Sequence, residues 1–145
     1  VTMAAASCAG NSGDALSRGN TGERIADITD KFSYWFCPGY KKFSKREEEL
    51  PFDQHMLLSL IAPRLLYTSA RTRDSWADPE GQFQSLLEVS SVYEIYGKEG
   101  IKKGSRQKPE TPLQDSCIGH HIKTGFHGLD EYDWNCYLDF ADRHL

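Results

Sequence analysis

The stretch Arg64–Ala70 (RLLYTSA), with Arg71–Pro79 (RTRDSWADP) directly behind it, determines which fold class the sequence predicts. RLLYTSA is short, mostly apolar and preceded by a proline, which is typical of a strand buried on both faces. Pro79 then opens a helix, because proline is well suited to the first helical position. A buried strand that runs through a polar loop into a helix is typical of an α/β fold with a parallel sheet.

The segments on both sides of this unit show the same alternation. Upstream, the sequence predicts a strand over Val1–Ala6, a loop over Ser7–Asp14, and helices over Arg24–Trp35 and Phe52–Ile61. Downstream, it predicts a helix over Pro79–Ile95, a basic loop over Lys98–Lys108, a weaker strand over Cys117–Ile122, a loop over Lys123–Leu129 and a final helix capped by Asp130. Strands that alternate with helices predict a parallel sheet with helices on its faces.

Apolar residues at helical spacing indicate the face that each helix buries. The first expected helix carries Ile25, Ile28, Phe32 and Trp35; Pro38 and Gly39 end it, and Lys41–Glu49 is a charged excursion. The helix after Pro79 carries Phe83, Leu86, Leu87, Ser90, Val92 and Ile95, and the last carries Trp134, Tyr137, Leu138, Ala141 and Leu145. Because three strands alone would leave both outer strands as exposed edges, we expect residues 1–145 to be the C-terminal part of one larger domain.

The composition is that of a soluble globular protein. The 145 residues are 39% hydrophobic and 26% charged, within the range of an ordinary domain. Apolar runs are far shorter than the roughly 20 residues of a membrane span, so we expect no membrane partner. The net charge of −4 gives no reason to expect nucleic acid, and we interpret Lys98–Lys108 as a solvated loop.

The cysteines and histidines show no metal-binding pattern. The cysteines lack C-x-x-C spacing: they are Cys8, Cys37, Cys117 and Cys136. The adjacent His120 and His121 lack a second ligand pair at zinc-site spacing. We expect no metal and no other cofactor. Buried free thiols are the simplest expectation, while one or two disulfides stay open for a secreted protein, as does the oligomeric state.

An acid and a histidine follow two neighbouring expected strands. Asp74 comes after RLLYTSA and His127 after Cys117–Ile122, and the carboxyl ends of parallel strands collect functional groups. This is the chain order of the acid and histidine in an α/β-hydrolase triad, where the histidine takes a proton from a serine. The G-x-S-x-G serine elbow is missing, and Ser12 lacks the second spaced glycine. By spacing alone the pair is weak evidence, because an Asp at a strand end is often a helix cap or a loop hydrogen-bonder, and a loop His is more often structural than catalytic.

Four stretches resemble the bacterial branch of the glucuronoyl esterases, carbohydrate esterase family 15. They are GER (Gly22–Arg24), DQHMLLSLIAPR (Asp53–Arg64), DSWADPEG (Asp74–Gly81) and Gly119–Leu145, which contains HHIKTGFH, EYDW and YLDFADRHL. They occur in the family's order across most of the chain. The resemblance implies an α/β-hydrolase fold, which has three layers. It implies an enzyme that cleaves the esters formed between (4-O-methyl-)glucuronic acid on xylan and lignin alcohols. It also implies a secreted or periplasmic enzyme without a cofactor.

The resemblance also assigns roles to single residues. His127 matches the catalytic histidine, and Asp74 matches the acid that many bacterial members use. Trp76 matches the tryptophan that lines the sugar pocket, and Glu23 matches a glutamate that hydrogen-bonds the glucuronate hydroxyls. Ordinary packing of Trp76 and a favourable charge of Glu23 at a helix N-terminus are the structural alternatives. Asp78, one residue before a proline, is expected to cap a helix.

The sequence departs from the family in three places. The family's first half, with its serine elbow, oxyanion-stabilising arginine and sugar-contacting lysine, has no counterpart here. Cys8 stands where some members place a catalytic glutamate, and the loop Ser7–Arg18 matches a glycine-rich segment only loosely. We therefore expect the isolated chain to be inactive. The alternatives to a glucuronoyl esterase are an acetyl-xylan or other carbohydrate esterase of the same fold, and a non-catalytic carbohydrate-binding module derived from it.

Overall fold

A parallel β-sheet lies at the centre of the chain. The computed structural model describes residues 2–7 and 22–145. Within them the sheet consists of β1 (Met3–Ser7), β2 (Leu65–Arg71) and β3 (Ile118–Lys123), in the order β1-β2-β3. Both neighbours run parallel to β2. The strands that the sequence predicts are therefore confirmed, and so is their parallel arrangement.

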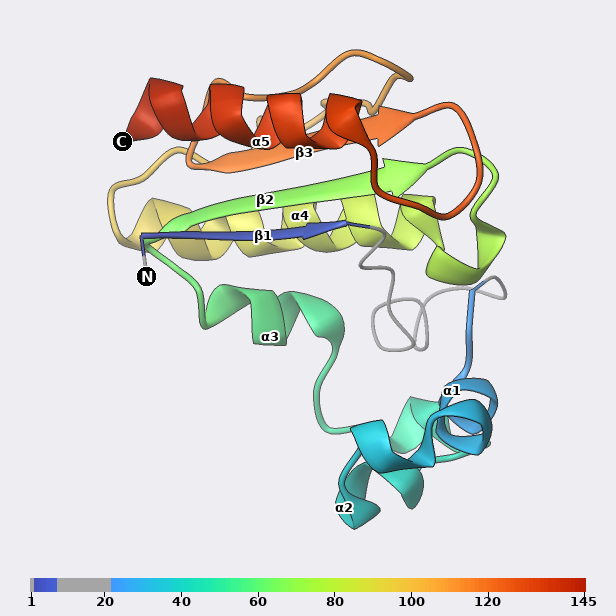
Figure 1. Cartoon of the computed structure of the whole chain (residues 1–145). Helices are drawn as coiled ribbons and strands as arrows, with labels where there is room; N and C mark the ends of the chain where they lie inside the picture. Colours follow the sequence, from blue (N-terminus) through green and yellow to red (C-terminus); the bar gives the residue numbers. More distant parts are fainter. Residues whose placement is uncertain (1, 8–21) are drawn as a thin grey trace.

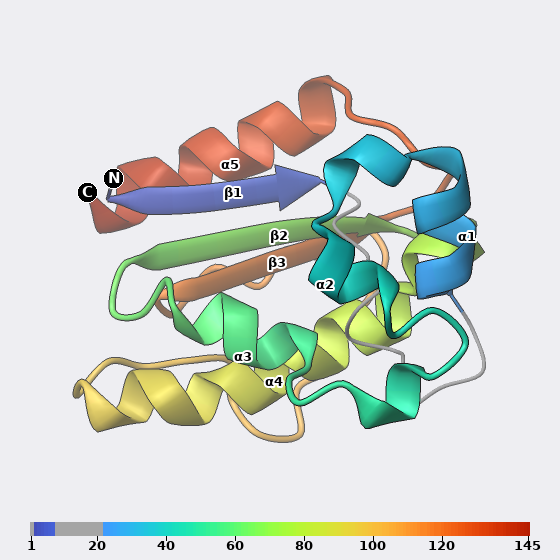
Figure 2. The ribbon, with the colours of Figure 1, turned by 90° about the horizontal axis from the view of Figure 1, so that it is seen from below.

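Helices cover both faces of this sheet (Figures 1 and 2). α5 (Glu131–His144) lies on one face, and α4 (Pro79–Ile95) lies on the other with α3 (Gln54–Ser59) packed against it. α1 (Ile25–Lys31) and α2 (Pro38–Lys41) lie together on the α3 side, near the carboxyl ends of the strands. The described residues thus form the three-layer α/β arrangement that the sequence predicts.

β2 is the central strand, and each of its residues is buried. Side chains alternate between the faces of a strand. On one face Leu66 packs into the cluster that contains Phe83 of α4. On the other face Tyr67 packs edge-to-face against Tyr137 and Phe140 of α5. Burial on both faces explains why RLLYTSA is apolar without strict alternation.

Gly119 in β3 makes room for the packing of α5 on the sheet. A Cβ atom at this position would lie 2.3 Å from Cδ2 of Tyr67 and 2.9 Å from Cε2 of Phe140. The two rings meet edge-to-face with their centroids 4.9 Å apart, a favourable aromatic geometry. Any side chain at Gly119 would have to push these rings apart.

Both long helices begin at the expected caps. The Asp78 side chain accepts a hydrogen bond from Gly81 N at 3.1 Å, which confirms the cap predicted for α4. In α5, Asp130 accepts a hydrogen bond from Tyr132 N at 3.0 Å, while Asp133 accepts one from Asp130 N at 2.7 Å. The Asp130 side chain also accepts from the backbone N–H of Asp133, so Asp130 and Asp133 form a capping box.

The first expected helix is shorter than predicted. α1 ends at Lys31, because Phe32 leaves helical backbone (φ −129°, ψ 54°), and a 3-10 turn follows over Ser33–Trp35. The prediction that Pro38 and Gly39 end the helical segment is wrong, since Pro38 is the first residue of α2. The charged stretch that follows is also structured.

Glu47 explains part of that order in the charged stretch. It belongs to a 3-10 turn over Glu47–Glu49, and it is buried. Its Oε1 accepts a hydrogen bond from Ile25 N at 3.2 Å, at the start of α1. A carboxylate at a helix N-terminus satisfies an otherwise unpaired N–H and interacts favourably with the helix dipole. The charge pattern of the sequence did not predict this contact.

The buried faces of α4 and α5 are more polar than the apolar spacing predicts. In α5 the buried residues are Asp133, Cys136, Tyr137 and Phe140, whereas Trp134, Leu138 and Leu145 are exposed. In α4, Phe83, Leu86 and Ser90 are buried as predicted, but Gln82 and Ser85 are buried too and Ile95 is exposed. The predicted faces are therefore wrong in part. Polar partners account for part of this shift, since Asp133 pairs with Arg71 at the end of β2 and Gln82 Nε2 donates to Ser69 O at 3.3 Å.

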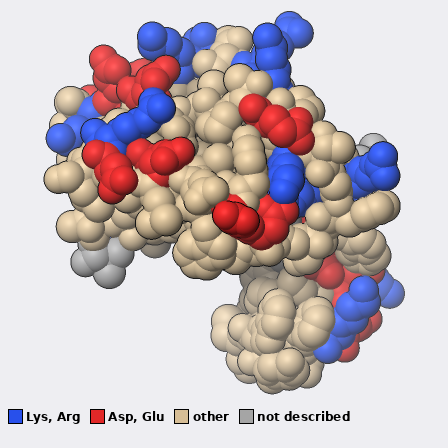
Figure 3. Space-filling view, turned by 45° about the horizontal axis from the view of Figure 1, so that its top comes forward, with Lys and Arg blue, Asp and Glu red and all other residues tan. Residues whose placement is uncertain are grey.

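The remaining expectations concern thiols and the basic loop. Cys136 is buried and Cys117 partly buried, but Cys37 is exposed because it precedes the short surface helix α2, so uniform thiol burial is wrong. Cys8, Ser12 and the rest of residues 8–18 lie outside the described residues. Lys98–Lys108 contains neither helix nor strand, as expected. On the face in Figure 3, basic and acidic side chains are interspersed.

The described residues contain no helix that is both long and apolar enough to cross a membrane.

Candidate active site

Asp74 and His127 meet at the carboxyl edge of the sheet. Asp74 follows β2 and His127 lies in the loop after β3. His127 Nδ1 is 2.8 Å from Asp74 Oδ2, although the residues are 53 positions apart in the chain. Parallel pairing aligns Arg71 at the end of β2 with Lys123 at the end of β3, which brings the two loops together. The structure therefore joins the acid and histidine that the sequence predicts as a pair.

The two members of this pair differ sharply in exposure. The Asp74 side chain is 5% exposed and the His127 side chain 73%. A carboxylate oxygen can only accept, so Nδ1–H of His127 donates to it and Nε2 carries the lone pair. Among the described residues, no hydrogen bond occupies Nε2. This is the orientation in which a histidine can accept a proton from an incoming hydroxyl.

Backbone hydrogen bonds hold Asp74 in place. Its N–H donates to the carbonyl of Arg71 at 3.2 Å, and its own carbonyl accepts from Ala77 N at 3.1 Å. These bonds build the tight turn between β2 and the 3-10 turn Ser75–Ala77. Because Asp74 leaves a buried central strand through this turn, its side chain has a defined direction.

The histidine loop is tied to the end of β2. Thr72 N donates to Lys123 O at 3.0 Å and Arg73 N donates to Gly125 O at 2.9 Å, while Gly125 N donates to Thr72 Oγ1 at 3.2 Å. Gly125 has φ of 142°, which side chains rarely allow, so glycine is required there.

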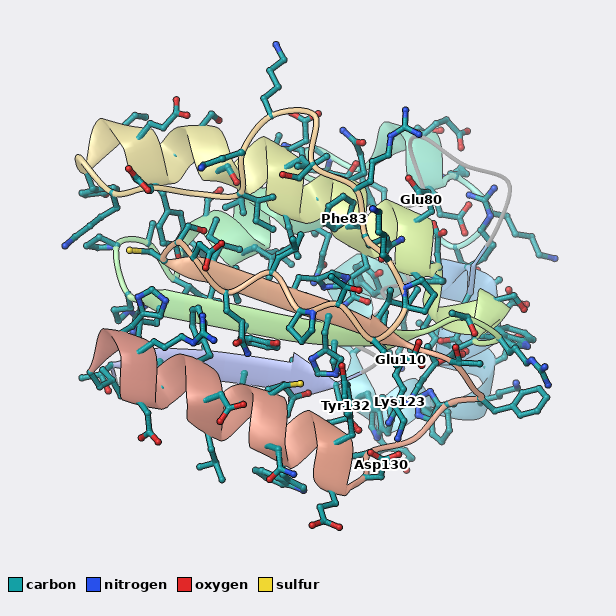
Figure 4. All side chains as sticks on the ribbon, turned by 90° about the horizontal axis from the view of Figure 1, so that it is seen from above. Glu80, Phe83, Glu110, Lys123, Asp130 and Tyr132 are labelled. Atoms are coloured by element: carbon teal, nitrogen blue, oxygen red, sulfur yellow. The ribbon has the colours of Figure 1, made fainter. Side chains whose placement is uncertain are left out.

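An ion pair closes the base of the same loop. Lys123 Nζ donates to Asp130 Oδ2, and it lies 5.2 Å from the centroid of the Tyr132 ring (Figure 4). The hydrogen bond from Lys123 lowers the pKa of the Asp130 carboxyl. The loop that carries His127 therefore leaves β3 and enters α5 through neighbouring residues.

Trp76 and Glu23 lie beside this pair. Glu23 N donates to the carbonyl of Trp76 at 2.9 Å. The Trp76 ring is 52% exposed, so it is not a core residue, and Lys31 Nζ lies 4.4 Å from its centroid. An open cavity of about 250 Å³ adjoins it, lined by Gly22, Asp27, Ser75 and Trp76. The cavity thus lies against the indole ring and beside Ser75, the residue that follows Asp74.

The Glu23 carboxyl responds electrostatically to its neighbours. Its pKa is raised by burial, lowered by Lys31, and raised again by the carboxylates of Asp27 and Asp74. The effect of Asp74 is the smallest of these. Glu23 precedes α1, so its alternative interpretation as a favourable charge at a helix start also fits its position.

The sequence did not predict a buried polar network that runs from Gln114 to Arg71. Gln114 Nε2 donates to Tyr67 Oη at 3.3 Å, so the Tyr67 hydroxyl donates to His121 Nδ1 at 3.0 Å. His121 Nε2 in turn donates to Asp133 Oδ1 at 2.8 Å, and Asp133 Oδ2 pairs with Arg71. Burial lowers the pKa of His121, which is therefore neutral in this network. One feature of the sequence could have indicated this network: Arg71 is a charged residue at the end of a buried strand, where its side chain needs a polar partner.

His120 is also occupied by structural hydrogen bonds. Its Nδ1 lies 2.9 Å from Thr68 Oγ1 and its Nε2 lies 3.0 Å from Gln107 Oε1. Complete burial lowers its pKa to about 3. Within residues 2–7 and 22–145, no group of three or more His, Cys, Asp or Glu side chains could hold a metal ion.

The sequence matches a protein-family model described as "Glucuronyl esterase, fungi" over residues 1–97. The chain belongs to the glucuronoyl esterase family, CE15. Carbohydrate esterase MZ0003, from an unknown prokaryotic organism, is 38% identical to it over 138 residues, which are 95% of this chain and 32% of that protein.

Solved structures of CE15 esterases superpose closely on this family member. A promiscuous CE15 esterase from a marine bacterial metagenome has a TM-score of 0.92 and 36% identity, covering 99% of this chain and 36% of that one. The glucuronoyl esterase from Solibacter usitatus has a TM-score of 0.87 and 40% identity, covering 97% and 36%. The CE15 chain thus spans about a third of the length of these relatives, and its α/β fold corresponds to part of theirs.

Membership of CE15 confirms the resemblance found in GER, DSWADPEG and the C-terminal stretch. It does not by itself assign roles to His127, Asp74, Trp76 and Glu23, which stay predictions.

Proposed function

We propose that this chain is the C-terminal part of the catalytic domain of a glucuronoyl esterase, a serine carboxylic-ester hydrolase. Its substrate would be the ester between (4-O-methyl-)glucuronic acid on xylan and a lignin alcohol. The observation that carries the proposal is the hydrogen bond of 2.8 Å between His127 Nδ1 and Asp74 Oδ2 at the carboxyl edge of the sheet. A polymeric substrate of this kind requires a secreted or periplasmic enzyme.

In this proposal His127 moves the protons of a serine that the rest of the domain supplies. Nε2 takes the hydroxyl proton as the serine oxygen attacks the ester carbonyl, and it returns the proton to the leaving alcohol. Nε2 then deprotonates a water molecule, which attacks the acyl-enzyme. As the acyl–serine bond breaks, the imidazolium returns the proton to the serine oxygen and glucuronate is released. Asp74 keeps the imidazole in one tautomer and stabilises its cation. The chemistry requires no cofactor.

The sugar would bind beside the histidine. The exposed Trp76 ring offers an apolar surface for a pyranose, and Glu23, held through its backbone to Trp76 O, offers a carboxylate for hydroxyl groups. Trp76 follows Asp74 by two residues, and the Glu23 carboxyl interacts electrostatically with that of Asp74. In this proposal a glucuronate bound there would present its ester group to His127. An acetyl group has no ring to contact these residues.

A broader ester preference is the second candidate. It has specific support, because one of the solved relatives is described as promiscuous. An acetyl-xylan esterase of the same fold would use the same His127 and Asp74 without needing Trp76 or Glu23. The non-catalytic binding module has weaker support, because carbohydrate binding alone does not require an exposed histidine paired with a buried carboxylate.

Product release from two esters by the longer protein, in which this chain follows its upstream half, tests the proposal. We expect faster release of free acid from benzyl glucuronate than of acetate from acetylated xylan. A reversed preference would establish the acetyl-xylan alternative. Glucuronoxylan binding without turnover of either ester would establish the binding module.

A further inference from the structure

The carbonyl of Gly128, the residue after His127, is held from two strands. It accepts a hydrogen bond from Ser7 Oγ at the end of β1 and another from Arg71 Nη2 at the end of β2, both at 3.2 Å. Adjacent strand ends thus converge on one peptide group beside the histidine. Fixing this carbonyl fixes the direction in which the chain leaves His127.

Arg71 also contacts the other member of the pair. Its backbone carbonyl accepts the hydrogen bond from Asp74 N at 3.2 Å. The same residue therefore holds Asp74 through its main chain and the His127 loop through its side chain. The relative position of His127 and Asp74 depends on Arg71 at both ends.

The Arg71 side chain is itself held in a fixed orientation. Its Nη2 pairs with Asp133, and both side chains are almost completely buried. Asp133 is bound in turn by His121 Nε2 at 2.8 Å, so the guanidinium lies in a network that leaves little freedom of movement.

Stability alone is a weak reason for this arrangement. A buried ion pair is often replaceable by apolar side chains without loss of stability. Moreover, Arg71 Nη1 is buried and has no hydrogen-bond partner among the described residues. The hydrogen bonding of the guanidinium is therefore incomplete, although most buried polar groups are paired. What the buried guanidinium does provide, through Nη2, is a donor to the Gly128 carbonyl.

We propose that Ser7 and Arg71 form a clamp on the Gly128 carbonyl that positions His127 for proton transfer. Both are positioning residues, because neither lies on the reacting atoms and each acts through the histidine loop. The inference rests on the proposed function and names the side chains that align its base. A misplacement of about 1 Å at a reacting group can lower the rate about 10²-fold.

The test uses paired variants of the longer protein acting on benzyl glucuronate. Ser7→Ala removes one donor to the carbonyl, and Ser7→Thr keeps it. Arg71→Lys keeps a positive charge beside Asp133 but removes the guanidinium, whose Nη2 donates to both Asp133 and the Gly128 carbonyl. Tyr67→Phe is the matched control, since it breaks the same buried network at His121 without touching Gly128.

The expected result separates kcat from KM. We expect Ser7→Ala to lower kcat about tenfold, which corresponds to about 1.4 kcal/mol, and Ser7→Thr to restore it. Arg71→Lys should lower kcat about 10²-fold, in line with misplacement of a reacting group. KM should stay unchanged in each case, because neither residue contacts substrate. Tyr67→Phe should lower the unfolding temperature but not kcat.

Unchanged kcat in Ser7→Ala would overturn the clamp even if Arg71→Lys fails to fold, and so would an equal loss of kcat in Tyr67→Phe. Hydrogen exchange distinguishes failure of the clamp from failure of the proposed function. If the parent protein does not hydrolyse the ester, faster amide exchange in residues 124–130 of Ser7→Ala would still support the clamp. Unchanged exchange there would overturn it.

Discussion

The buried carboxylate of Asp74 binds Nδ1 of His127, whose side chain is 73% exposed. The carboxylate thus lies in the core while the imidazole faces outward. This asymmetry supports the proposed role of His127, in which it meets a hydroxyl supplied by another part of the domain. It also means that substitutions at Asp74 and at nearby carboxylates should have separable effects on catalysis and on folding.

Substitution of Asp78 should affect folding but not catalysis. Asp78→Ala should lower the free energy of unfolding by about 1–2 kcal/mol, because α4 loses its cap and Ala is strained at φ 44°. kcat should be unchanged, since Asp78 serves α4 rather than His127. Chemical denaturation and ester hydrolysis measure the two effects. Asp78→Asn keeps a capping oxygen and is the control; a large loss of kcat in Asp78→Asn would mean that Asp78 is a catalytic acid.

Trp76→Ala should weaken binding of the sugar. We expect KM for benzyl glucuronate to rise on the order of tenfold, equivalent to about 1.4 kcal/mol, with little change in kcat. The exposed Trp134 on α5 offers a matched control, because it lies on another part of the surface. An equal KM in Trp76→Ala and the parent would remove Trp76 from the sugar subsite.

Gly119→Ala should destabilise the fold. The added methyl group would have to displace the Tyr67 and Phe140 rings, and overpacking of this kind costs about 1–3 kcal/mol. Gly39→Ala is the control, because its Cβ would meet only Cys37 Sγ at an ordinary 3.7 Å. Urea denaturation compares them. Equal midpoints for the two variants would show that α5 can move away at no cost.

Stability should fall as the pH drops from about 6.5 to 5. Burial lowers the pKa of His121, and it lowers that of His120 to about 3, so both stay neutral in the folded state at pH values where the unfolded chain binds protons. Each can contribute a slope of up to about 1.4 kcal/mol per pH unit below its unfolded pKa. Most carboxyl groups titrate below this range.

Urea midpoints measured across that pH range, for the parent and for His120→Asn, check this expectation. The variant cannot titrate at residue 120, so its midpoint should depend less steeply on pH. Identical slopes would show that His120 is not kept neutral by the fold.

The sequence was sufficient for the parts of the fold that local chemistry dictates. RLLYTSA predicts the central strand because burial on both faces selects a continuous apolar run. Asp78 and Asp130 predict helix starts because their side chains cap N–H groups. Parallel strands present their carboxyl ends at one edge, which made a pair of Asp74 and His127 a candidate. The support for that pair came from the resemblance to the glucuronoyl esterases.

Long-range polar contacts could not be predicted in the same way. The carboxylate of Glu47 at the start of α1 and the link from Arg71 to Gly128 join residues far apart in the chain. Asp133 has the appearance of a surface residue in a charged helix, yet it is fully buried because Arg71 and His121 satisfy it. The burial of Asp133 depends on how α5 packs against the sheet, and no local sequence pattern encodes that packing.

Hydrolysis of benzyl glucuronate by the longer protein and its His127→Ala and Asp74→Asn variants tests the central claim most directly. We expect the parent to turn over, His127→Ala to be inactive, and Asp74→Asn to lose on the order of 10⁴-fold in kcat, as when the acid of another triad is replaced by its amide. Turnover that survives in a folded His127→Ala variant would contradict the assignment of this histidine as the base.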